Sequence, residues 1–92
     1  MNTITLEILN SGLARITARI DGRSLRSIEC TPKPTDIAMA IYDVMRSEFN
    51  GLMLSDGRYE EKYIKLNPPA KEIYDAAIKH EMFYFKTRPR PS

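Results

Sequence analysis

Residues 14–20 read Ala14-Arg15-Ile16-Thr17-Ala18-Arg19-Ile20, so apolar residues alternate with polar ones at every second position. A period of two is typical of a strand with one side in a core and the other in water. The apolar side chains can enter the core only if Arg15, Thr17 and Arg19 stand together on the opposite face. Because each guanidinium can donate two parallel hydrogen bonds, such a strand can dock phosphates or carboxylates. We therefore interpret the chain first as a binding protein.

Residues 3–9 carry a second alternating pattern, and residues 10–12 read Asn-Ser-Gly. Two alternating segments joined by a short loop that contains glycine predict a β-hairpin. With Leu9 opposite Leu13, the apolar side chains of the two strands share one face, and a slip by one residue would send them all into water. The same register sets Glu7 beside Arg15, so we expect the Glu7 carboxylate to pair with the guanidinium of Arg15 and to use part of its binding capacity.

Asp21-Gly22 is a two-residue turn signal of the kind that favours positive φ. Residues 23–30 are therefore expected to return along the second strand as a third strand. The simplest register from this turn places Arg26 on the face that carries Arg15 and Arg19. We expect these three guanidinium groups to form one basic surface.

That register has one unfavourable consequence in the third strand. It points Ser27 toward the core and Ile28 toward water, against their polarity. We therefore predict a β-bulge near Arg26 and Ser27, which would return Ile28 to the core.

The middle of the chain predicts a linker and a helix. Residues 31–34 contain two prolines, which cannot continue a strand ladder. Thr35 or Asp36 can cap the helix that follows, and Asn50-Gly51 is its expected end. The apolar residues with helical spacing are Ile37, Ala38, Ile41, Val44, Met45 and Phe49.

Residues 60–67 alternate again and predict either a second small hairpin or a fourth strand on the same sheet. Asn67 is expected to cap a second helix that starts at Pro68 and runs into the low eighties. Residues 82–85 are either the last turn of that helix or an extended segment. The basic, proline-rich residues 87–92 are expected to be disordered unless a partner holds them.

These patterns predict the α+β class: a small antiparallel sheet of three N-terminal strands plus one or two later strands, packed against two helices. A length of 92 residues suits one core, so we expect one domain over residues 1–86 and a flexible tail over 87–92. The formal net charge of +2 excludes bulk attraction as the force that holds the molecule on nucleic acid. The charge is uneven, because residues 1–34 are basic and residues 35–57 are acidic.

Cysteine content and hydropathy indicate the compartment. The single cysteine, Cys30, excludes an intramolecular disulfide and fits a reducing environment. No apolar run approaches the length of a membrane span. Because the sequence also lacks a long apolar seam, we expect a soluble, cytoplasmic monomer.

Catalytic and metal chemistry find little support in the residue types. The only histidine, His80, lies in a charged helical stretch, and one histidine with one cysteine cannot supply the four ligands of a structural zinc site. We expect no metal, no cofactor and no enzymatic activity. The alternation of Tyr59, Lys62, Tyr63 and Lys65 is open to two interpretations, stacking of nucleic-acid bases or ordinary packing on a strand.

Several parts of the chain together resemble the phage-encoded anti-CRISPR proteins that inhibit the type I-F system. The resemblance is carried by residues 1–10, by the hairpin over residues 15–26 and by residues 59–85 with the Asn67-Pro68-Pro69 junction. It implies a stoichiometric, non-enzymatic inhibitor in the bacterial host cytoplasm during phage infection. Its partner would be the type I-F (Csy) surveillance complex, which assembles Cas8, Cas5 and a Cas7 backbone around a guide RNA, and the inhibitor would block target DNA binding. A small phage regulator that binds DNA or RNA directly is the alternative.

The charged residues give two candidate contact surfaces for such a partner. The basic surface would touch guide RNA or an acidic Cas surface. Its residues are Arg15, Arg19 and Arg26, joined by Arg23, Lys33, Arg88 and Arg90. The alternative surface lies on the first helix and would face basic Cas residues. Its residues are Asp36, Asp43 and Glu48.

Overall fold

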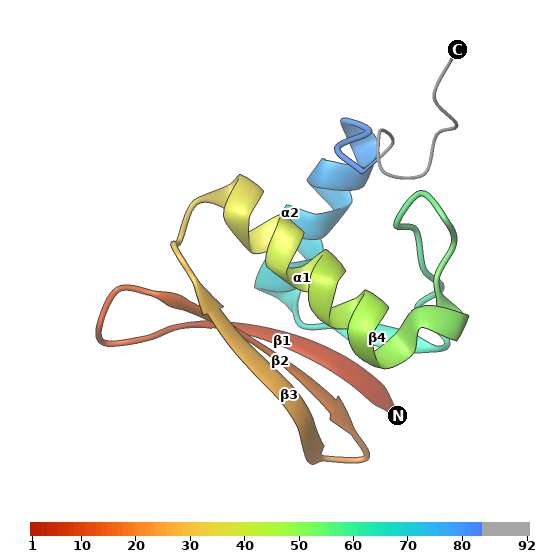
Figure 1. Ribbon diagram of the computed structural model, residues 1–92, viewed down its shortest axis with the longest axis horizontal. Coiled ribbons are helices and arrows are strands. Elements are labelled where there is room, and N and C mark those ends of the chain that lie inside the picture. The colour runs from red at the N-terminus through yellow and green to blue at the C-terminus, as the bar shows by residue number, and fades with distance from the viewer. Residues whose placement is uncertain (84–92) are drawn as a thin grey trace.

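Residues 1–83, which the computed structural model describes, form a four-stranded sheet with both helices on one side (Figure 1). The elements in chain order are β1 (Asn2–Ile8), β2 (Ala14–Ile20), β3 (Arg23–Cys30), α1 (Pro34–Phe49), the short 3-10 helix η1 (Asn50–Leu52), β4 (Ile64–Leu66) and α2 (Pro68–Lys79). The strands lie side by side in the order β3-β2-β1-β4. Helix α1 packs over β2 and β3, and α2 packs over β1 and β4. The predicted α+β class is therefore confirmed.

The β1–β2 hairpin has the predicted register. Leu6 pairs with Ile16 and Glu7 pairs with Arg15. The turn closes through hydrogen bonds from the Leu9 amide to the Leu13 carbonyl and from the Gly12 amide to the Leu9 carbonyl, and Gly12 supplies the positive φ that this turn needs. One register thus places the apolar side chains of both strands on one face and the polar ones on the other. This is why the alternating pattern was enough to predict the pairing.

Strand β3 pairs antiparallel with β2 through the predicted two-residue turn, but the bulge lies earlier than expected. The register shifts between Ala18 and Arg19, so Leu25 is the extra residue and Arg26 pairs with Ala18. Ile28 returns to the covered side, as predicted. The bulge lies one residue before the predicted place near Arg26 and Ser27, because one extra residue anywhere between the turn and Ile28 satisfies the burial of that isoleucine.

The later strand settles the two alternatives for residues 60–67. Strand β4 joins the same sheet beside β1, and the pairing is parallel, with Thr3 opposite Lys65. The sheet is therefore mixed rather than wholly antiparallel. Outside the named strands, Met53 and Tyr59 form one isolated antiparallel bridge.

Asn67 continues the β1–β4 ladder with its side chain. Its Nδ2 donates to the Leu6 carbonyl at 3.1 Å, and its Oδ1 accepts from the Leu6 amide at 3.0 Å. The carboxamide thus acts as one more peptide unit of the strand. The predicted side-chain cap of α2 was wrong, since Asn67 occupies the N-cap position without capping through its side chain.

Helix α1 also starts differently from the prediction. It begins at Pro34, and neither Thr35 nor Asp36 caps it, since Lys33 holds the N-cap position without a side-chain bond. Proline suits the first helical position because its missing amide hydrogen is not needed there. Asp36 instead accepts a hydrogen bond from the Thr31 hydroxyl.

The core fills the space between the covered side of the sheet and the two helices. All six apolar residues predicted for the first helix are buried. Helix α2 ends at Lys79, short of the low eighties, and Glu81 has a φ of 55° that reverses the chain. This reversal returns Phe83 to the core, where its ring stacks on Tyr42 with centroids 4.4 Å apart. Of the ambiguous residues 82–85, the last two lie outside the described residues, as does the predicted tail 87–92.

Gly57 lets the loop before β4 pack closely on this aromatic cluster. Its φ is +92°, and a Cβ at this position would lie 2.8 Å from Cδ2 of Phe83. The hydroxyl of Tyr74 donates to the Gly57 carbonyl at 2.6 Å. A side chain here would both strain the backbone and displace a core ring.

We expect Asn67→Ala to lower the free energy of unfolding by about 2 kcal/mol, because it leaves the amide and the carbonyl of Leu6 without partners. Urea denaturation measures the change. The matched control is Asn50→Ala, whose exposed side chain makes no hydrogen bond in residues 1–83. Equal losses in the two variants would contradict the role given to Asn67.

Gly57→Ala is expected to destabilise the protein by at least about 2 kcal/mol, since alanine meets both the positive φ and the Phe83 ring. Gly51→Ala is the matched control, because nothing lies within 4 Å of a Cβ at that position. Thermal unfolding of the two variants compares them directly. A Gly57→Ala variant as stable as Gly51→Ala would show that the loop does not pack as described.

Candidate functional site

The residues that the strand register places on the side of the sheet away from both helices are polar or charged, and we call this side the open face. Residues paired across neighbouring strands point to the same side, so the register assigns its members. They are Thr3, Thr5 and Glu7 of β1, Arg15, Thr17 and Arg19 of β2, Ser24, Ser27 and Glu29 of β3, and Lys65 of β4.

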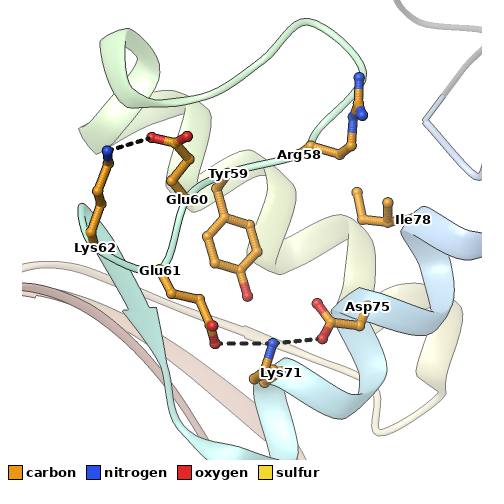
Figure 2. Close-up of a pocket in the computed structure, with 8 residues that line it drawn as sticks. All are labelled: Arg58, Tyr59, Glu60, Glu61, Lys62, Lys71, Asp75 and Ile78. Carbon is orange, nitrogen blue, oxygen red and sulfur yellow. Dashed lines mark hydrogen bonds and ion pairs between the residues drawn. The ribbon is translucent and has the colours of Figure 1, made fainter.

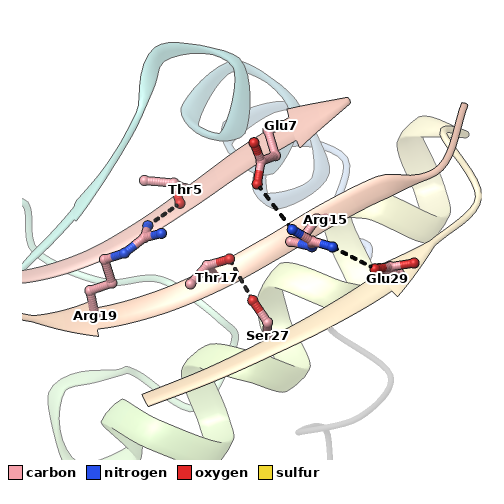
Figure 3. Close-up of polar contacts among 7 residues, drawn as sticks. All are labelled: Thr5, Glu7, Arg15, Thr17, Arg19, Ser27 and Glu29. Carbon is pink, nitrogen blue, oxygen red and sulfur yellow. Dashed lines mark hydrogen bonds and ion pairs between the residues drawn. The ribbon is translucent and has the colours of Figure 1, made fainter. Parts of the chain in front are cut away.

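Arg15 stands between two carboxylates on the open face (Figure 3). Its Nη2 lies 3.0 Å from Oε2 of Glu29, and its Nη1 lies 3.8 Å from Oε1 of Glu7. The predicted pairing of Glu7 with Arg15 is confirmed, and Glu29 forms a second ion pair with the same guanidinium. The positive charge of Arg15 is therefore largely offset.

The middle of the open face is a row of hydroxyl groups. Oγ1 of Thr17 and Oγ of Ser27 share a hydrogen bond of 2.7 Å. Thr17 is only 4% exposed although it faces away from the helices. Arg15 and Arg19, two residues on either side of it along β2, flank this threonine on the same face (Figure 3).

Arg19 and Lys65 lie toward the β4 side of the open face. Nη1 of Arg19 donates to Oγ1 of Thr5 at 3.0 Å, so the guanidinium bends across β1 (Figure 3). Lys65 is exposed and pairs with Thr3, which pairs in turn with Arg19. Within residues 1–83, no carboxylate lies within salt-bridge distance of either cation. A shallow hollow of about 300 Å³ lies here, lined in part by Thr3, Thr5 and Lys65.

The other predicted basic residues lie elsewhere. Arg26 pairs with Ala18 and therefore points to the covered side, where its Nη1 donates to Oγ of Ser47 on α1 at 2.7 Å. Arg23, opposite Ile20, points to that side as well. The expectation that Arg26 shares a face with Arg15 and Arg19 was wrong, because the bulge at Leu25 reverses the sides of the residues that follow it. Lys33 lies at the start of α1. Arg88 and Arg90 lie outside the described residues.

The alternative acidic residues are only partly brought together. Asp36 and Asp43 are seven positions apart on α1, which places them on the same side of the helix. Glu48 lies five positions further on, about 140° round the helix axis. It accepts a hydrogen bond from the hydroxyl of Ser47, which in turn bonds Arg26.

A larger charged hollow of about 550 Å³ lies between the loop before β4 and α2 (Figure 2). At its base, Nζ of Lys71 lies 3.0 Å from Glu61 and 2.8 Å from Asp75. These hydrogen bonds, with Asp75 contributing most, raise the pKa of Lys71 above its usual value. The (i, i+4) spacing of Lys71 and Asp75 is a helix signal that the sequence interpretation did not use.

Tyr59 points into this region, and its hydroxyl oxygen is buried without a hydrogen-bond partner among the described residues (Figure 2). Burial, with a contribution from the Asp75 carboxylate, raises the pKa of Tyr59 to about 12. The ring centroids of Tyr59 and Tyr74 are 5.8 Å apart. This contact favours ordinary packing over base stacking as the role of Tyr59. Tyr63 is 46% exposed, with Nζ of Lys62 5.2 Å from its ring centroid.

The residues considered for catalysis and metal binding lie at the ends of two elements. Cys30 ends β3 and is half-buried, and His80 is exposed directly after α2. Among residues 1–83, no group of three or more histidine, cysteine, aspartate or glutamate side chains is arranged to hold a metal ion. None of the helices in that part of the chain is long and apolar enough to span a bilayer.

Comparison of the chain with protein-family models, with curated proteins and with solved structures gives no match.

Tyr59→Phe is expected to leave the free energy of unfolding unchanged or to raise it by up to about 1 kcal/mol, since it removes a buried hydroxyl that no described residue bonds. Tyr74→Phe is the matched control. It loses the bond to the Gly57 carbonyl and should lower stability by about 1–2 kcal/mol.

The variant Tyr59→Phe also tests the titration of Tyr59. Tyr59 has a pKa of about 12 when folded and 10.0 when exposed. Its contribution to stability is therefore complete below pH 10 and is lost as the pH rises toward 12. Absorbance at the phenolate band should show one titration near pH 12 that is absent in Tyr59→Phe. A Tyr59 that titrates near pH 10 would contradict its burial.

Proposed function

We propose that the chain is a stoichiometric, non-enzymatic inhibitor that binds the type I-F (Csy) CRISPR surveillance complex through its open face and blocks target DNA binding. The observation that carries this proposal is a rigid sheet face, covered by neither helix, on which Thr5 holds Arg19 in position and no acid of residues 1–83 neutralises it. Fixed polar groups lose little conformational entropy when they bind, so such a face suits docking onto a larger assembly.

The chemistry of the partner fits both kinds of charge on this surface. A surveillance complex holds DNA with basic grooves, and its guide RNA presents phosphates. Arg19 and Lys65 suit phosphates or acidic side chains, while Glu7 and Glu29 at the other end of the open face suit basic ones. An inhibitor seated across such a groove excludes target DNA by occupying its place.

The experiment that tests the proposal is a pull-down of the purified type I-F complex with the tagged protein, followed by competition with target DNA. Saturation at a fixed stoichiometry and loss of DNA binding are the expected results. A gel shift with naked DNA and RNA separates the alternative of a direct nucleic-acid regulator. Tight binding to naked nucleic acid at moderate salt, with no binding to the complex, would replace the proposal by that alternative.

Because Arg19 and Arg15 lie on the open face and Arg26 lies on the covered side, the three arginines give a matched set of variants. Arg19→Ala should weaken binding to the complex about tenfold or more, because a charge-assisted contact contributes about 1.5–3 kcal/mol. Arg15→Ala should weaken it less, since Glu7 and Glu29 already offset its charge. Arg26→Ala removes the same charge from the covered side and should leave the affinity unchanged in surface plasmon resonance. An Arg26→Ala loss larger than that of Arg19→Ala would place the contact surface elsewhere.

A further inference from the structure

We infer that the part of the open face between Arg19 and Lys65, beside the hollow that Thr3, Thr5 and Lys65 line in part, is a binding site for a phosphate group. The two cations lie on either side of Thr3 in the sheet, because β2, β1 and β4 lie side by side and these three residues are in register. Neighbouring strands are about 4.8 Å apart, so the backbones of Arg19 and Lys65 are separated by roughly 10 Å. Side chains of this length can both reach a group seated over Thr3.

The charge at this end of the open face is unbalanced. Four side-chain cations of the described chain have acidic partners close by: Arg15 has Glu29, Arg58 has Asp56, Lys62 has Glu60, and Lys71 has Glu61 and Asp75. Within residues 1–83, Arg19 and Lys65 have none. Of the cations in residues 1–83 without such a partner, Arg19 and Lys65 are the two that the register places on the open face. Two uncompensated cations on one rigid surface attract an anion.

The donors come from two sides, and this arrangement distinguishes a phosphate from a carboxylate. The hydrogen bond to Thr5 holds the Arg19 guanidinium over β1 and uses one of its five N–H groups (Figure 3). Lys65 belongs to the strand on the other side of β1, and Thr3 stands in register between the two cations. A tetrahedral phosphate presents oxygens in both directions, whereas a planar carboxylate matches a single arginine fork.

The phosphate has two possible sources, a free ion or the backbone of a nucleic acid. For the second source the inference rests on the proposed function, in which guide RNA would supply the group. The site itself is tested on the isolated chain, so that a failure to bind the surveillance complex would not affect the result.

The experiment is an amide chemical-shift titration of the full chain with sodium phosphate, against sodium chloride at equal ionic strength. Saturable shifts at Thr3, Thr5, Arg19 and Lys65 are expected with phosphate only. The variant Arg19→Gln with Lys65→Gln should weaken the affinity at least fivefold. The control Arg58→Gln with Lys79→Gln removes the same two residue types from other surfaces and should bind as the unchanged protein does.

Thr3→Val separates a built site from diffuse attraction. It keeps the charge and the shape of the side chain but removes the hydroxyl, so it should weaken phosphate binding at least twofold. The circular dichroism spectrum of each variant confirms that it is folded. Equal phosphate affinities in all four proteins, or shifts that chloride reproduces, would overturn the inference.

A parallel titration with a single-stranded RNA of ten nucleotides identifies the source. Affinity at least tenfold above that of phosphate, lost in Arg19→Gln with Lys65→Gln, indicates a nucleic-acid backbone. The slope of log affinity against log salt should then fall by about 0.7 in that variant, as expected for the loss of one phosphate contact on a single strand. RNA affinity no higher than that of phosphate indicates the free ion, and either result supports the site.

Discussion

Burial of the apolar side of β1 and β2 is the constraint on which the rest of the structure depends. Alternation places every apolar residue of these strands on one side, so both helices must cover that side to form a single core. The opposite side is then left to polar residues. Arg19 lies on the open face because Ala18 and Ile20 must avoid it.

Two local features turn this constraint into a defined surface. The carboxamide of Asn67 extends the parallel pairing of β1 with β4, which sets Lys65 in register with Thr3 and Arg19. Gly57 allows the preceding loop to pack on Tyr74 and Phe83, and this contact fixes the loop against the core. The open face is therefore supported by contacts on the covered side, far from the residues that it presents.

The fold was predictable wherever neighbouring residues carried the information. The β1–β2 register followed from the agreement of both faces, and the helical spacing identified the buried side of α1. The position of the bulge was not predictable, because burial of Ile28 requires one extra residue without specifying which. The parallel pairing of β4 joins segments about sixty residues apart, as the Asn67 bonds to Leu6 do, and local patterns carry no signal for it. The candidate site shares this division. The common face of Arg15 and Arg19 was predictable from β2 alone, Arg26 was expected on the wrong side, and the position of Lys65 in register with Arg19 depends on β4.

The most direct test of the central claim is photo-crosslinking from two positions that lie on different surfaces. A photoreactive residue replaces Ser27, which is exposed on the open face, or Asp43, which is exposed on the outer side of α1. If the open face is the contact surface, crosslinks to the type I-F complex form from position 27 and none form from position 43. Crosslinks from position 43 alone would contradict that role of the open face and would favour the acidic helix as the contact surface.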